Sequence, residues 1–229
     1  MNFFYDLTQI NEYTYSLKIH GGHYIITLYQ TIINMLKNAY YDNETETIIF
    51  TAESINPLKM VLFNKSEKKG KNEKTEKNKM GLNQCIKMID DLTKQISYLK
   101  TIHFGFYGFD ISDILVIDGT YLFCNTQYLL PLYNDNFLFI EPISKPYFSS
   151  PEIIKLTILP TEINNKCIYY SLGVLVIFCL LNNYLLVSNE IKSPEEIENI
   201  MKPIFNTKIY WFLKRCLETN LEKRVLLLI

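Results

Sequence analysis

The side chains with the clearest capacity for chemistry are the histidines and cysteines, and their spacing argues against a metal or redox site. His20 and His23 flank a glycine pair as HGGH, but two histidines without a neighbouring cysteine or acid seldom hold zinc. The five cysteines are scattered and form no CxxC pair, so neither a disulfide framework nor a zinc site is indicated. We expect a turn at HGGH and reduced, mostly buried thiols.

The charge balance excludes a nucleic-acid partner. The net charge of the 229 residues is −1, whereas phosphate binding needs a basic field. Residues 65–79 hold 7 lysines and 3 glutamates, a local +4, so the remainder carries −5. The first residues, MNFFYDLTQINEY, lack the basic and long apolar regions of a secretory signal, so we expect a cytoplasmic protein.

The elements expected before residue 65 are mainly strands. Alternation through 13–30 around a glycine pair predicts a hairpin, 31–41 predicts a short helix, and 47–54 and 59–64 predict two further strands. Residues 65–79 contain no apolar side chain, so we expect a flexible loop there that divides the chain into two lobes.

After that loop, the sequence predicts mainly helices. An apolar stripe predicts a helix over 80–100, and an Asp-Gly turn predicts a hairpin over 113–125. Prolines favour an extended segment over 128–149. Two Ser-Pro-Glu sequences mark further helix starts, and a last helix is predicted over 209–217. These patterns together predict an α+β protein.

The stretch 167–187 is the organising element of the second half. It is apolar on all sides, so a helix here must be buried in protein or in lipid. The uninterrupted run ends after Leu181, which makes it short for a bilayer. The sequence therefore favours a buried core helix, and a membrane protein anchored through 167–187 is the alternative.

Four motifs in order resemble the eukaryotic protein kinase family. They cover most of residues 80–229 and align with the family's catalytic loop, the end of its activation segment, its central helix and its last conserved motif. In this sequence they are ISYLKTIHFGFYGFDISDILV (96–116), PYFSSPEI (146–153), YYSLGVLVIFCLL (169–181) and FLKRCLETNLEKR (212–224). The resemblance implies a two-lobed kinase-like fold with a small, reduced β-rich N-lobe (1–64) and a mainly α-helical C-lobe (80–229).

The resemblance also assigns roles to individual residues, and most catalytic positions are substituted. Gly108 stands at the position of the catalytic base. Asp113 replaces the metal-binding asparagine and could still hold a cation, and Asn125 replaces the metal-binding aspartate. Glu152 and Arg224 match a structural ion pair of the family.

The sequence offers alternative positions for the phosphate-binding lysine and for the catalytic base. If YIITLY is the third strand, Thr27 takes the place of the lysine, and this register is favoured; the alternative register, YSLKI, supplies Lys18. Asp110, two residues beyond the base position, could swing in as a base, although a loop cap is the more common role of such a residue.

The leading hypothesis is therefore a catalytically inactive pseudokinase that acts as a protein-interaction scaffold, with a protein partner and no nucleic acid or membrane. The alternative is an atypical Ser/Thr protein kinase that uses ATP and Mg²⁺ with displaced residues. The sequence leaves open whether ATP and Mg²⁺ bind at all.

Overall fold

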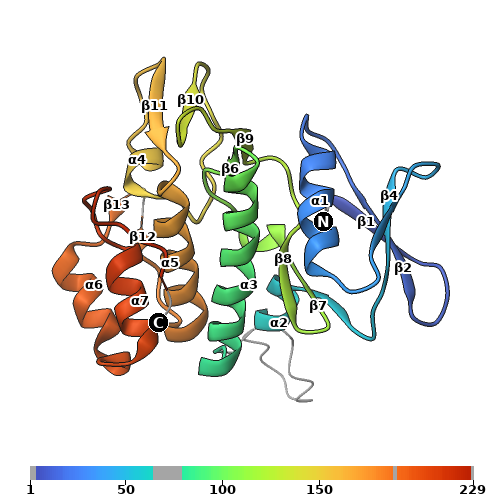
Figure 1. Cartoon of the computed structure of the whole chain (residues 1–229). Helices are drawn as coiled ribbons and strands as arrows, with labels where there is room; N and C mark the ends of the chain where they lie inside the picture. The colour runs from blue at the N-terminus through green and yellow to red at the C-terminus, as the bar shows by residue number, and fades with distance from the viewer. Residues whose placement is uncertain (1–3, 64–78, 188–189, 228–229) are drawn as a thin grey trace, which may run out of the picture.

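The protein is mixed α+β in this computed structural model, which describes residues 4–63, 79–187 and 190–227. Figure 1 shows a four-stranded sheet at one side, helix α1 beside it, the long helix α3 in the middle, and α4, α5, α6 and α7 on the far side of α3. The expected loop over 65–79 lies outside the described residues except for Lys79.

The first sheet is antiparallel, with the strand order β1-β2-β4-β3. Its inner face packs on α1 through side chains such as Leu17, Leu28 and Ile48, each fully buried. The elements are β1 (Tyr5–Gln9), β2 (Thr14–Ile19), α1 (Ile25–Met35), β3 (Tyr40–Asp42) and β4 (Thr47–Thr51).

Two predictions in this region are wrong. The chain after the glycine pair enters helix α1 instead of a second strand, because Leu28, Tyr29 and Ile32 lie on one helical face that the sheet buries. The expected helix over 31–41 therefore begins earlier and ends at Met35. Residues 59–64 belong largely to a helix, α2 (Leu58–Phe63), where the buried pair Leu58 and Leu62 has helical spacing.

The middle of the chain places a hairpin against the long helix. The predicted helix and the predicted hairpin are both confirmed, as α3 (Leu82–Thr101) and as β7 (Ile114–Ile117) with β8 (Thr120–Phe123). A short strand, β5 (Ile55–Pro57), joins the hairpin, and the 3₁₀ turn η1 (Ile111–Asp113) precedes it. Helix α3 contacts α1, α5, β6 and β8.

The segment expected to be extended holds two strands with distant partners. Strand β6 (Phe104–Phe106) pairs with β9 (Leu129–Pro131), and β10 (Asn136–Phe139) pairs with β11 (Thr161–Asn164).

The remaining helices surround α5 (Cys167–Leu181), which coincides with the apolar run. It contacts α3, α4, α6 and α7, so every side is covered by protein, and Leu172, Val176 and Cys179 are fully buried. Among the described residues, no helix combines the length and apolar character of a membrane span. The other elements are α4 (Pro151–Ile154), β12 (Leu186–Val187), β13 (Glu190–Ile191), α6 (Pro194–Met201), η2 (Lys202–Ile204) and α7 (Lys208–Cys216).

Both Ser-Pro-Glu helix starts are confirmed, at α4 and α6. At α6 the Ser193 side chain accepts a hydrogen bond from the backbone of Glu196, whose carboxylate in turn accepts from the Ser193 backbone. This reciprocal capping is the arrangement that the sequence predicts.

Candidate functional site

The two residues assigned to metal binding meet at the base of the β7–β8 hairpin. Ile114 pairs with Phe123 across the strands, which places the preceding Asp113 beside the residues that follow β8. Asn125 Nδ2 donates to Asp113 Oδ1 at 2.8 Å, and the backbone N–H of Asp110 donates to Asp113 Oδ2 at 2.6 Å. Each carboxylate oxygen of Asp113 therefore accepts a hydrogen bond from protein.

Asp113 is closed off from solvent, with 2% of its surface exposed. Desolvation by burial raises the pKa of this carboxyl to about 6, and the hydrogen bonds from Asn125 and Asp110 offset that rise only in part. Asn125 is also buried, and its Oδ1 accepts from the backbone of Gln127 at 3.0 Å. Every side-chain oxygen of the pair already accepts a hydrogen bond from the protein and both residues are buried, so the pair does not fit Mg²⁺ as it stands.

Asp110 is held by two donors from the segment after β8. The Tyr128 hydroxyl donates to Oδ2 at 2.8 Å, and the backbone N–H of Tyr147 donates to Oδ1 at 2.6 Å. Burial, with the hydrogen bond to Asp110, raises the pKa of Tyr128. These contacts make Asp110 a structural acceptor that fixes the loop, as its capping of η1 also indicates.

Gly108, at the position of the base, lies directly under the chain around Pro146. A Cβ added to this glycine would stand 2.3 Å from Pro146 Cγ and 3.0 Å from the Phe148 carbonyl oxygen. The position therefore has no room for an aspartate side chain in this arrangement.

A polar contact joins the β2–α1 connection to the residues after β8. The Thr126 hydroxyl donates to the Gly21 carbonyl at 2.6 Å, and a Cβ on Gly22 would stand only 2.2 Å from Thr126 Oγ1. Both glycines have positive φ, +70° and +105°, which glycine adopts without the strain that other residues incur. The glycine pair thus lets two distant segments approach closely.

The two candidates for the phosphate-binding position lie on different elements. Lys18 is in β2, on the exposed face opposite the buried Leu17 and Ile19, and its ammonium group forms no hydrogen bond or ion pair with any residue that the structure describes. Thr27 lies in helix α1, so the favoured register, which placed Thr27 in a strand, is wrong. YSLKI is the strand segment, because its inward side chains fill the sheet core.

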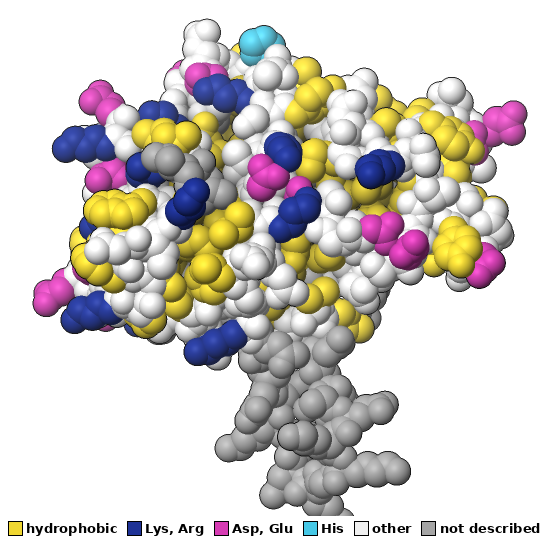
Figure 2. Space-filling view, turned by 60° about the horizontal axis from the view of Figure 1, so that its bottom comes forward, with side chains coloured by type: hydrophobic (Ala, Val, Ile, Leu, Met, Phe, Trp, Pro, Cys, Tyr) yellow, Lys and Arg dark blue, Asp and Glu magenta, His cyan; other side chains and the backbone are white. Residues whose placement is uncertain are grey.

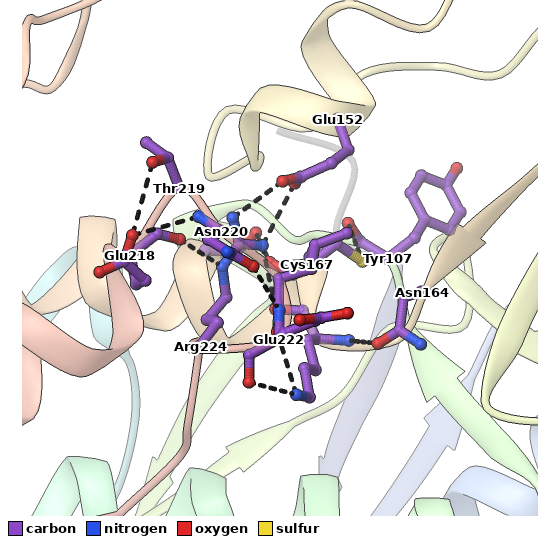
Figure 3. Close-up of polar contacts among 12 residues, drawn as sticks. Tyr107, Glu152, Asn164, Cys167, Glu218, Thr219, Asn220, Glu222 and Arg224 are labelled. Carbon is purple, nitrogen blue, oxygen red and sulfur yellow. Dashed lines mark hydrogen bonds and ion pairs between the residues drawn. The ribbon is translucent and has the colours of Figure 1, made fainter.

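Glu152 and Arg224 form a bidentate ion pair (Figure 3). Arg224 Nη2 lies 2.8 Å from Glu152 Oε1, and Arg224 Nη1 lies 3.2 Å from Oε2. The guanidinium is fully buried; it also donates to the carbonyls of Glu218 and Lys166 and lies over the ring of Tyr170 at 5.2 Å. Burial alone would raise the pKa of Glu152, but the hydrogen bonds and the positive charge of Arg224, together with further hydrogen bonds, outweigh burial and lower it.

Sequence reasoning missed a buried polar junction that positions the hairpin. Gln95 in α3 is fully buried: its Oε1 accepts from the Phe123 backbone at 2.8 Å, and its Nε2 donates to Thr31 Oγ1 in α1 at 2.8 Å. Asp91, one turn earlier, accepts from the Tyr121 backbone at 3.0 Å. The only signal was a pair of polar residues four apart beside the apolar stripe of the helix.

The main cavity lies elsewhere. It measures about 540 Å³ and is bounded by α4, α6, β13 and the segment after α7, with Tyr170 and Leu217 among its lining residues. Its lining contains none of the residues that the resemblance assigned to catalysis. Within the described parts of the chain, no group of three or more His, Cys, Asp or Glu side chains could hold a metal ion.

Comparisons with known proteins add no family assignment. No protein-family model matches the sequence, and no curated protein sequence matches it. The functional argument therefore depends on the residues and their geometry.

Proposed function

We propose that this chain is a divergent protein kinase-like domain that no longer transfers phosphate and acts by binding another protein. The order of elements supports the proposal. A small antiparallel sheet with one helix precedes a long helix, a hairpin with the candidate metal-binding residues at its base, and a buried central helix. This is the order that the resemblance implies.

The Glu152–Arg224 pair supports the same fold. The resemblance assigns these two positions to a structural ion pair, and here they form a bidentate pair with a fully buried guanidinium although 72 residues separate them. A chance pair of surface charges would not be expected to bury its guanidinium completely.

The single observation that carries the loss of catalysis is the contact between Asp113 and Asn125. Phosphoryl transfer needs carboxylates that hold Mg²⁺, a base and a cation on the phosphates. Here the one acid is satisfied by an amide and by backbone, Gly108 has no side chain to act as base, and Lys18 has no carboxylate partner among the described residues.

The surface supports a protein partner more than a nucleic acid. In Figure 2, basic and acidic side chains are interspersed among apolar ones, without a continuous basic surface on that face. Together with a net charge of −1, this gives no electrostatic basis for binding a phosphate backbone.

A thermal-shift titration with ATP, with and without Mg²⁺, tests the loss of catalysis. A ligand at 100 times its dissociation constant would stabilise the protein by about 2.7 kcal/mol, and we expect no Mg²⁺-dependent shift. Phosphate transfer from labelled ATP that Asp113→Ala abolishes, and that the exposed control Asp90→Ala preserves, would instead establish the atypical kinase.

The scaffold role has its own test. We expect the same protein partner to be recovered, in stoichiometric amount and from ATP-depleted extract, by the wild type and by Asp113→Asn. Recovery only in the presence of ATP, or only by the wild type, would contradict a scaffold that works without nucleotide.

A further inference from the structure

Helix α7 carries an exposed surface that combines an aromatic ring with two cations. Lys208, Trp211 and Arg215 follow one another at spacings of three and four residues, which places them on one side of the helix. Trp211 is 49% exposed; Lys208 is also exposed, and Arg215 is partly buried. The opposite side of α7 is buried against the core. We call these three residues the α7 surface.

Two neighbouring rings extend this surface and hold it in place. The ring centroid of Tyr210 lies 5.1 Å from that of Trp211 and 5.1 Å from that of Phe205. Tyr210 is buried, and its hydroxyl donates to Glu198 at 2.5 Å, so the middle ring of the row is fixed. Phe205 is 58% exposed. Tryptophan, tyrosine and arginine dominate the binding energy of protein interfaces, and this part of the molecule presents all three.

The charge around the α7 surface is positive. Residues 202–216 contain four cations and no carboxylate. Lys214 is neutralised by Glu198, with Nζ and Oε2 2.9 Å apart. The other three cations of this stretch form no ion pair with any residue that the structure describes. A partner that supplies carboxylates would therefore complement this surface, because complementary charges steer association and set its specificity.

A membrane and a nucleic acid each fit this surface less well than an acidic protein. An interfacial helix turns its apolar face toward the lipid, whereas the apolar side chains of α7 other than Trp211 are buried in the core. A phosphate backbone needs an extended basic field, and the net charge of the chain is −1.

We propose that the α7 surface binds an acidic helix of the partner protein, in which two carboxylates seven residues apart flank an apolar side chain. Lys208 and Arg215 are also seven residues apart, about 10.5 Å along the helix axis. A partner helix lying along α7 therefore places one carboxylate on each cation and the apolar side chain on Trp211. The inference rests on the proposed function for the existence of a protein partner, and it does not depend on the loss of phosphate transfer.

A fluorescence titration tests the chemistry of the partner. The probe is an alanine-based helical peptide with one leucine between two glutamates seven residues apart, and the control peptide has lysines in place of the glutamates. Trp211 is the only tryptophan of the chain, so its emission reports contact at this surface. We expect a saturable blue shift with the glutamate peptide alone. No shift with that peptide, or the same shift with both, would overturn the proposal.

Charge reversal tests the two cations. The double variant Lys208→Glu, Arg215→Glu should bind the glutamate peptide about tenfold or more weakly, since like charges then face each other, and it should bind the lysine peptide instead. The matched control is Lys18→Glu, Lys37→Glu, which reverses two exposed lysines of the first lobe and should leave both affinities unchanged. Equal effects of the two double variants would contradict the assignment of the surface.

Two further probes test the other classes of partner. Vesicles that contain phosphatidylglycerol and a single-stranded DNA oligonucleotide should both shift the Trp211 emission less than the glutamate peptide does. A stronger shift with either probe would overturn the proposal in favour of a membrane or a nucleic acid.

Recovery of the partner separates this inference from the proposed function. The wild type and the Lys18→Glu, Lys37→Glu control should recover the same protein, and the Lys208→Glu, Arg215→Glu variant should lose it. Equal recovery by all three would overturn the α7 surface as the site and leave the scaffold role standing.

Discussion

Two carboxylates, the partly buried Glu152 and the buried Asp113, have pKa values shifted in opposite directions. Glu152 faces the guanidinium of Arg224, and its pKa is lowered in spite of desolvation. Asp113 faces the neutral amide of Asn125, and desolvation raises its pKa to about 6. At both sites burial favours the protonated acid, and only at Glu152 does a charged partner reverse that preference.

The difference separates an ion pair whose charges compensate each other from a carboxylate that faces only neutral groups. The Glu152–Arg224 pair joins the start of α4 to the segment after α7, and each charge is satisfied within the protein. At Asp113 the protein supplies hydrogen bonds but no positive charge. The ionised form of Asp113 is therefore a cost to stability, whereas the ionised form of Glu152 is stabilising.

The largest expected loss of stability follows from removing Arg224. Arg224→Ala leaves Glu152 partly buried without a counter-charge, and breaking a buried pair in this way costs about 3–5 kcal/mol. Urea unfolding measures the change. Arg215→Ala removes a charge from α7 whose guanidinium bonds, among the residues described, to the Leu227 carbonyl alone, and it should cost well under half as much. Equal effects would mean that the pair contributes no more than a surface contact.

The contribution of Asp113 to stability should depend on pH in the opposite sense to that of Glu152. Because its folded pKa lies above the unfolded value, the folded state binds more protons between about pH 4 and 6, so this residue's contribution to stability falls as pH rises through 6. The shift corresponds to about 2–3 kcal/mol. We expect the unfolding free energy of wild type, compared with Asp113→Asn, to decline over this range; a parallel pH profile would contradict the raised pKa.

A second carboxylate placed beside Asp113 should increase the difference between the Asp113 site and the Glu152 site. Asn125→Asp removes the amide that donates to Asp113 and introduces a like charge, so we expect about 2 kcal/mol of destabilisation at pH 8. Lowering the pH to 5 should recover part of the loss, since the two carboxyls can then share a proton. Asp90→Asn, on the exposed face of α3, is the control for a change of one charge.

The smallest expected loss of stability comes from a steric clash at Gly108. Gly108→Ala forces a Cβ against Pro146 and the Phe148 carbonyl, and overpacking of this kind costs about 1–3 kcal/mol. Thermal unfolding should register the loss. Gly81→Ala is the matched control, since its added Cβ would meet nothing nearer than 3.5 Å. If the two alanine variants melt together, the loop has room at Gly108.

Long, strongly patterned segments were predictable from the sequence, and short ones were not. The apolar run of α5, the stripe of α3, the Asp-Gly hairpin and the capped start of α6 each have several local signals that agree. The stretch around Thr27 and the segment of α2 are short apolar runs that fit either a helix or a strand by periodicity. Packing decided them: helix α1 covers the inner face of the four-stranded sheet, and α2 packs against β5 and β7.

The sequence by itself determined the α+β class and the buried central helix, and it showed neutral residues at most of the positions that the resemblance assigns to catalysis. Tertiary structure alone decided that Lys18 lies in the strand, that Asp110 is held by Tyr128 and Tyr147, and that Gln95 joins α1, α3 and β8. The physical reason is separation along the sequence: periodicity and capping involve residues within one or two helical turns of each other. Hydrogen bonds between residues 18 to 64 positions apart exist only once the surrounding core has packed.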